Sequence, residues 1–141
     1  LSEAKALHPD PDIRWETDLP EDLPDIHADP DALRAALFNL FENAVKYASD
    51  TKLVRLSARA EPGWLRIEVE DRGIGIPAQE RSKVLDRFYR ASNAEAKRIP
   101  GSGIGLSIVA HVAEVHGGSL DIEEARPQGT RFRLSLPIIH A

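Results

Sequence analysis

The chain of 141 residues contains no cysteine, so it can form no disulfide bond, no thiolate zinc site and no cysteine nucleophile. It also lacks a cluster of basic residues, and its formal net charge of −5 argues against a nucleic-acid surface. No apolar run approaches the roughly 20 residues of a membrane-spanning helix, and no signal peptide opens the chain. What remains is the composition of one globular domain with one core. Because Leu1 is not a natural start, we expect the chain to be a piece of a longer protein.

The spacing of apolar residues predicts an α+β fold. Residues 1–11 are polar and contain prolines, which is typical of a linker tail, and the domain proper is expected over 12–141. In chain order the predicted elements are a strand at 13–17, a helix from 29 to about 48, strands at 52–60 and 64–71, a short helix at 78–85, a long helix at 104–116, and strands at 119–123 and 130–137. This order predicts a two-layer α/β sandwich, a mixed and mostly antiparallel sheet covered by helices on one face.

The first long helix carries an unusual polar stripe. Asp29 is its expected N-cap and Pro30 its first residue. Opposite the apolar face, a second face carries Asn39, Glu42, Asn43 and Lys46. A solvated helix face is the simplest interpretation, yet asparagine is a poor helix former and two of them lie one turn apart. Amide and carboxylate oxygens suit Mg²⁺, and a lysine one turn further can bind phosphate.

The strand at 64–71 ends on a carboxylate that falls on its apolar face. Leu65, Ile67 and Val69 share that face, and Asp71 continues the same alternation. A tight turn is one explanation for Asp followed by glycines, but a buried charge needs a partner. A carboxylate in this position can accept a hydrogen bond from an exocyclic amine such as that of adenine. Gly73 and Gly75 would then let the backbone approach the ligand.

A third motif, at 101–107, leads into the second long helix. Backbone N–H groups at a helix N-terminus favour an anion, although a flexible glycine linker would have the same composition. The P-loop, Rossmann and eukaryotic-type kinase patterns are absent. None of the five histidines has metal-ligand spacing, and His116 is interpreted as a helix-end residue favoured by the dipole.

With the segment 86–90, Asp-Arg-Phe-Tyr-Arg, these motifs resemble the catalytic, ATP-binding domain of bacterial sensor histidine kinases. That family lies in the larger group of gyrase B, Hsp90 and MutL. The resemblance covers about residues 13–137, with 39–47 as the N box, 71–77 and 101–107 as the glycine boxes, and 86–90 as the F box. It implies the Bergerat ATP-binding fold and, as cofactors, ATP with Mg²⁺.

The resemblance also implies a role for each site residue. Residues 91–102 would form a lid over the nucleotide. The catalytic residues would be Glu42 as general base, Asn43 and Lys46; the metal ligands Asn43 and Asn39; and the ATP contacts Asn39, Tyr47, Asp71, Gly73, Ile74, Gly75, Ile76, Arg90, Gly101, Gly103, Gly105, Leu106 and Thr130.

The family's phosphoacceptor histidine has a sequence context that no histidine here shares. We therefore expect the acceptor on an upstream dimerisation domain and a response regulator as the next partner. Contact of this domain with nucleic acid or membrane is not expected, and the isolated domain should be monomeric and cytoplasmic. Three alternatives stay open: a serine kinase of the anti-sigma-factor type, an ATP-driven clamp of the gyrase, Hsp90 or MutL kind, and a degenerate nucleotide-binding module.

Overall fold

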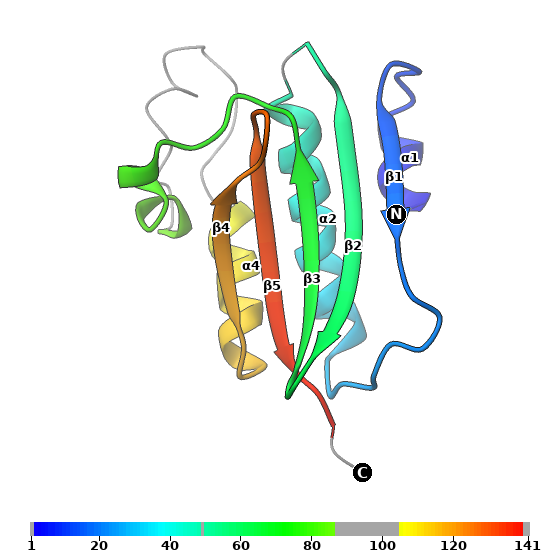
Figure 1. Ribbon diagram of the computed structural model, residues 1–141, viewed down its shortest axis with the longest axis vertical. Helices are drawn as coiled ribbons and strands as arrows, with labels where there is room; N and C mark the ends of the chain where they lie inside the picture. Colours follow the sequence, from blue (N-terminus) through cyan, green and yellow to red (C-terminus); the bar gives the residue numbers. More distant parts are fainter. Residues whose placement is uncertain (1, 49, 87–104, 140–141) are drawn as a thin grey trace.

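The computed structural model describes residues 2–48, 50–86 and 105–139. In this part of the chain, five strands form one sheet with helices packed behind it (Figure 1). The elements are the helices α1 (Ser2–Leu7), α2 (Pro30–Lys46) and α4 (Gly105–Val115), the 3₁₀ helices η1 (Ala78–Glu80) and η2 (Lys83–Leu85), and the strands β1 (Arg14–Asp18), β2 (Leu53–Glu61), β3 (Trp64–Asp71), β4 (Ser119–Glu124) and β5 (Thr130–Pro137).

The strand order is β1-β2-β3-β5-β4, and only the β1–β2 pair is parallel. Helices α2 and α4 cover one face of this sheet, which confirms the predicted mixed sheet with one helical layer. The apolar core between the layers contains residues of both helices and of the central strands. Its largest fully buried apolar side chains are Leu40, Val54, Val69, Val109, Leu134 and Leu136.

Helix α2 forms where its local sequence predicts it. Asp29 is the N-cap, and its Oδ1 accepts hydrogen bonds from Asp31 N at 3.0 Å and Ala32 N at 3.5 Å. Pro30 occupies the first helical turn, where its missing N–H removes no hydrogen bond. The helix buries Ala36, Leu40 and Ala44 at helical spacing, so the face that remains is the one with the polar stripe.

His116 follows the last residue of α4 and ties the two long helices together. Its Nδ1 lies 2.7 Å from the Val112 carbonyl, which can only accept, so Nδ1 carries the proton. Its Nε2 accepts a 3.0 Å bond from Asp29 N at the start of α2. The residue lies at the helix end as expected, but as a neutral bridge between helices rather than a charge placed for the dipole.

Three local predictions need correction. The segment 78–85 forms η1 and η2, two short 3₁₀ turns instead of one short helix. Residues 2–7 form α1, whose Ala4 is 1% exposed and belongs to the core, although the sequence suggested only a linker tail. In the long helix predicted at 104–116, the spacing of Ile108 from Val109, Val112 and Ala113 predicts that it shares their apolar stripe, but it is 40% exposed.

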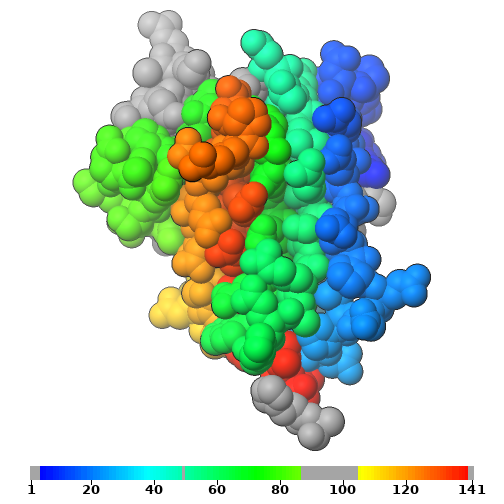
Figure 2. Space-filling view, in the orientation of Figure 1, coloured from blue at the N-terminus to red at the C-terminus, as the bar shows by residue number. Residues whose placement is uncertain are grey.

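No element among the described residues covers the sheet face away from the helices. In Figure 2, which has the same orientation as Figure 1, side chains of all five strands form the visible surface. On β3 the residues pointing to this face are Arg66, Glu68 and Glu70, as alternation predicts. Within the described residues, no helix is long and apolar enough to cross a membrane.

Candidate functional site

Asp71 ends β3 with its carboxylate on the helix side of the sheet, only 5% exposed. Its Oδ1 accepts hydrogen bonds from Gly73 N at 2.9 Å and Thr130 N at 3.2 Å. Neither bond uses Oδ2, which contacts no protein donor within residues 2–48, 50–86 and 105–139. One oxygen is therefore fixed by the protein, and the other is available to a ligand.

Burial raises the pKa of Asp71 to about 6, and it is the largest influence on this group. The backbone N–H groups of Gly73 and Thr130 and the charge of Arg72 act in the opposite direction, while Glu70 adds to the rise. A buried carboxylate with an unsatisfied oxygen lowers the stability of the folded domain. The presence of Asp71 at this position therefore favours a role in binding a ligand.

Two glycines allow the backbone to close around Asp71. A Cβ at Gly73 would lie 2.3 Å from the Tyr47 carbonyl oxygen. A Cβ at Gly129, whose φ is +107°, would lie 2.0 Å from the Asp71 carbonyl oxygen. Either contact is far below van der Waals distance, so any side chain would push the loop after β3 or the start of β5 away from the carboxylate.

The end of α2 is bonded directly to the loop after β3. Ile74 N donates to the Tyr47 carbonyl at 3.1 Å, and Tyr47 is the C-cap of α2. Lys46 is exposed, with its Nζ 5.6 Å from the centroid of the Tyr47 ring. The polar stripe and the Asp71 loop, separate in sequence, thus form one continuous surface.

Asn39 lies where α2 meets the start of α4. Its Nδ2 donates to the Ala35 carbonyl at 3.0 Å, which fixes the amide and leaves Oδ1 as the other polar atom. A Cβ at Gly105 would lie 3.3 Å from this Oδ1, so the first residue of α4 passes close to the amide. Leu106, the next residue, packs against the core.

Glu42, one turn along the same stripe, contacts a residue that sequence reasoning did not connect with the site. The Nε2 atom of His8, just after α1, forms a hydrogen bond and ion pair with Glu42 Oε1. An imidazole therefore contacts the carboxylate that the sequence suggests as the general base.

The residues of the stripe also fit a hard cation. Asn39 and Asn43 lie one turn apart on α2 and offer amide oxygens. Among the described residues no group of three or more His, Cys, Asp or Glu could hold a metal ion. This donor set matches Mg²⁺, which keeps several waters and binds phosphate oxygens as well, better than a metal that needs an all-protein cage.

The structure thus brings many predicted site residues together through backbone contacts. Asp71 meets Gly73 and Thr130, Tyr47 meets Gly73 and Ile74, and Asn39 meets Gly105. Ile76 packs against the core, and Gly75 has a φ of +76°. Arg90, Gly101 and Gly103, with the expected lid at 91–102, lie outside the described residues.

Two neighbours of the site were missed. Gly129 is not among the predicted site residues, although its place directly before Thr130 could have indicated that it lies next to Asp71. His8 gave no signal, because its contact with Glu42 joins residues 34 positions apart.

A buried carboxylate at a strand end, an amide-bearing helix face and close-packed glycine loops define a nucleotide-binding ATPase domain. Comparison with known proteins agrees. The family described as "Histidine kinase-, DNA gyrase B-, and HSP90-like ATPase" matches residues 28–140, and the chain belongs to it.

The similar proteins are sensor histidine kinases. The chain is 37% identical over 139 residues to the sensor-like histidine kinase SenX3 of Mycobacterium tuberculosis, covering 99% of this chain and 34% of SenX3. The mycobacterial sensor histidine kinase MprB is similar in structure, with a TM-score of 0.86, 31% identity and coverage of 99% of this chain and 91% of that chain. The ATP binding domain of PrrB from Mycobacterium tuberculosis gives a TM-score of 0.77, 32% identity, and 99% and 88% coverage. The chain thus corresponds to about a third of SenX3.

Proposed function

We propose that this domain binds ATP with Mg²⁺ and transfers the γ-phosphate to a histidine on a dimerisation domain that precedes it in the whole protein. The observation that carries the proposal is the Asp71 carboxylate, buried with one oxygen fixed and the other without a protein donor in the described chain. The relatives of this chain are named histidine kinases, which supports a histidine as the phosphate acceptor.

Adenine recognition is assigned to Asp71. Its Oδ2 would accept a hydrogen bond from the exocyclic amine, directly or through a water that Thr130 helps to hold. Gly73 and Gly75 allow the close approach that this contact needs. Guanine has a carbonyl in place of this amine, so the same carboxylate would repel it and favour adenine.

Phosphate binding is assigned to the polar stripe of α2. Asn39 and Asn43 would hold Mg²⁺, with Asn43 as the principal protein ligand, and Lys46 would bind phosphate oxygens. Bound Mg²⁺ neutralises charge on the phosphates. The residues of the stripe then contribute mainly by positioning, which is the main protein contribution to phosphoryl transfer.

Glu42 is proposed to take a proton from the acceptor histidine. The acceptor nitrogen forms a bond to the γ-phosphorus, the bond from that phosphorus to the β,γ-bridging oxygen breaks, and ADP leaves. The contact between His8 and Glu42 supports this role, because it places an imidazole nitrogen against the carboxylate. His8 would have to move aside before another imidazole could make the same contact.

In the whole protein the phosphohistidine would pass its phosphate to an aspartate of a response regulator. The domain would work as part of a cytoplasmic region, whether or not the protein is anchored in a membrane. The response regulator and the cytoplasmic location are both proposed from the relatives, which are named sensor histidine kinases.

The test uses the full-length protein with ATP labelled at the γ-phosphate. Phosphohistidine is lost in acid and retained in alkali, so the expected product is acid-labile and alkali-stable. An acid-stable product would refute histidine as the acceptor and point to a serine kinase. ATP-dependent dimer closure without any phosphoprotein would indicate a clamp instead.

A further inference from the structure

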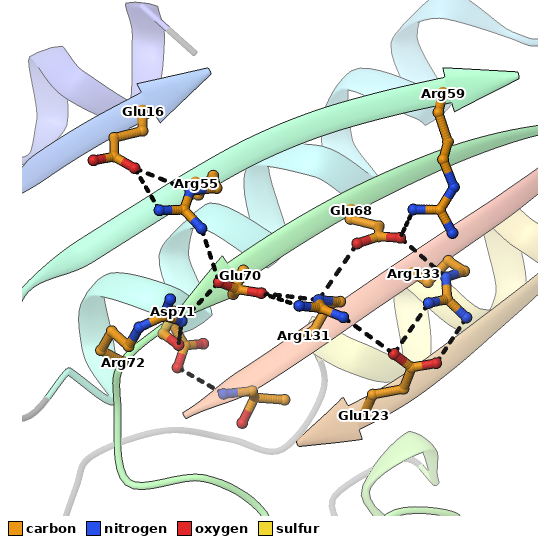
Figure 3. A network of polar contacts seen from close by, with 11 residues as sticks. Glu16, Arg55, Arg59, Glu68, Glu70, Asp71, Arg72, Glu123, Arg131 and Arg133 are labelled. Carbon is orange, nitrogen blue, oxygen red and sulfur yellow. Dashed lines mark hydrogen bonds and ion pairs between the residues drawn. The ribbon is translucent and has the colours of Figure 1, made fainter. Parts of the chain in front are cut away.

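The uncovered face of the sheet carries a lattice of ion pairs from β1 to β4 (Figure 3). At its centre Glu68 and Glu70 are 7% and 5% exposed, although no helix covers them. Arginine side chains from neighbouring strands enclose both carboxylates. We call this set the open-face lattice; it contains Glu16, Arg55, Arg59, Glu68, Glu70, Arg72, Glu123, Arg131 and Arg133.

Glu70 joins three segments of the chain through one carboxylate. Its Oε1 accepts from Nε and Nη2 of Arg131 on β5, at 2.8 and 2.7 Å. Its Oε2 accepts from Nη1 of Arg72, at 2.7 Å, and from Nη1 of Arg55 on β2, at 3.2 Å. Burial acts to raise the pKa of Glu70, but hydrogen bonds from Arg131 and Arg72 outweigh it and keep the pKa below its ordinary value.

The next residue, Asp71, points to the other face, and its two donors are neighbours of these arginines. Gly73, which donates to Asp71 Oδ1, directly follows Arg72. Thr130, the other donor, directly precedes Arg131. The Arg72 Cα and the Gly73 N–H lie in one planar peptide unit, so a shift of the Arg72 backbone moves that N–H group. Thr130 N lies one residue before Arg131 on the same strand, β5, which is paired with β3. Glu70 on one face and Asp71 on the other therefore hold the same two segments.

We propose that Glu70 is a positioning residue for base recognition: by binding Arg72 and Arg131 on the open face, it fixes the two N–H donors that orient the Asp71 carboxylate. This inference rests on the proposed function, since it requires Asp71 to bind the nucleotide base. A purely structural role would make Glu70 equivalent to the rest of the open-face lattice.

Glu68 provides the matched control. It lies two residues earlier on β3, is buried to a similar degree, and accepts from Arg59 at 2.8 Å and Arg133 at 3.2 Å. Neither of these arginines is next to a residue that contacts Asp71. Glu68 Oε2 also lies 3.4 Å from Nε of Arg131, so what distinguishes Glu70 is its contact with Arg72 and its shorter contact with Arg131. Glu68→Gln and Glu70→Gln thus remove the same charge from the same lattice and differ in their relation to the site.

The experiment measures binding of ADP to the domain by calorimetry, and thermal unfolding of the same samples. Both variants are expected to melt at lower temperature than the wild type. Glu70→Gln should weaken ADP binding by about tenfold, the loss expected for one charged hydrogen bond held in poor geometry. Glu68→Gln should change it by less than about twofold.

The pH profile of ADP binding separates positioning from general destabilisation. The charges that face Asp71 are those of Arg72 and Glu70, and the negative charge of Glu70 contributes to the raised pKa of Asp71. The bonds from Gly73 and Thr130 lower this pKa and are larger influences than the Glu70 charge, so displaced donors in Glu70→Gln should move the midpoint of the pH profile to higher pH, while Glu68→Gln leaves it in place. A shift to lower pH in Glu70→Gln would mean that only a charge was removed and would count against positioning.

Equal losses of ADP affinity in the two variants, or unchanged affinity in Glu70→Gln, would overturn the inference. Should Glu70→Gln fail to fold, Arg72→Gln decides, because it leaves Glu70 paired with Arg55 and Arg131. Several-fold weaker ADP binding in that variant supports the proposal, and wild-type affinity refutes it. Failure of the wild-type domain to bind ADP would instead refute the proposed function.

Discussion

At the scale of single residues, the burial of Asp71 costs stability, and its proposed role in base recognition explains why the residue is kept. Its pKa of about 6 is raised mainly by burial, so the folded state binds the proton more tightly than the unfolded chain does. The domain is then relatively more stable below the unfolded pKa and loses stability as pH rises through about 6. The full cost of the ionised carboxylate, about 3 kcal/mol, is present at pH 8.

Asp71→Asn should remove this cost together with the function. The amide oxygen can still accept from Gly73 and Thr130, but it brings no charge, and the remaining NH₂ group cannot accept from an adenine amine. We expect a melting temperature at pH 8 equal to or above that of the wild type, and a smaller gain at pH 5. ADP binding, measured by calorimetry, should fall by about 100-fold. Wild-type affinity in this variant would remove Asp71 from the base contact.

The role of Glu42 can be separated from ATP binding. In the full-length protein, Glu42→Gln should slow phosphoryl transfer by about 10² to 10⁴, the usual contribution of a general base. Binding of ATP should change little, because the base acts on the acceptor. Labelled-phosphate incorporation and equilibrium binding are measured on the same preparation. A transfer rate like that of the wild type would leave Glu42 with only its contact to His8.

At the scale of elements, the site is formed at the junction between α2 and the loop after β3. Tyr47 ends the helix, and its carbonyl accepts from Ile74 while lying against Gly73. This junction brings the helix residues proposed to bind metal and phosphate next to the strand carboxylate proposed to bind the base. Its closeness depends on the absence of a side chain at position 73.

Gly73→Ala tests this junction, with Gly63→Ala as its control. The new Cβ at position 73 would lie 2.3 Å from the Tyr47 carbonyl oxygen, so we expect a loss of about 3 kcal/mol in unfolding free energy. At position 63 a Cβ meets nothing within 4 Å, and only its φ of +83° adds strain, about 1 kcal/mol. Denaturant unfolding gives both values, and calorimetry should show that only Gly73→Ala loses ADP affinity. Equal effects would mean that the junction can relax without loss.

Local sequence predicts an element well where its own residues decide it. Asp29 and Pro30 start α2, and alternation from Trp64 gives the bounds of β3 and the unusual place of Asp71. Where contacts between residues distant in sequence determine the structure, the local sequence does not predict it. The polar segment of α1 is ordered by the packing of Ala4, which no periodicity reveals. The exposure of Ile108 likewise depends on where α4 crosses its neighbours.

At the scale of the whole molecule, one sheet has two chemically different faces. Alternation predicts that Glu68 and Glu70 point away from the core, but not that both are buried. Their burial depends on the strand order, which places β2 and β5 on either side of β3 so that arginines of both reach the glutamates. The candidate site residues could thus be listed from motifs, while the support behind Asp71 required the assembled sheet.

Because a ligand that binds only the folded state stabilises the whole domain, nucleotide binding can be followed through global unfolding. At 100 times its dissociation constant, ADP with Mg²⁺ should add about 2.7 kcal/mol. For a domain of this size this corresponds to a rise of about 8 °C in melting temperature.

The rise should shrink when Mg²⁺ is removed by a chelator, since Asn43 and Asn39 would then hold no cation. Asn43→Asp should weaken the Mg²⁺-dependent binding, so the difference between the samples with and without Mg²⁺ should shrink. Asp71→Asn, with about 100-fold weaker binding, should reduce the rise to about 1 °C. A rise independent of Mg²⁺ in the wild type, or an Asn43→Asp variant identical to it, would place the cation away from the α2 stripe.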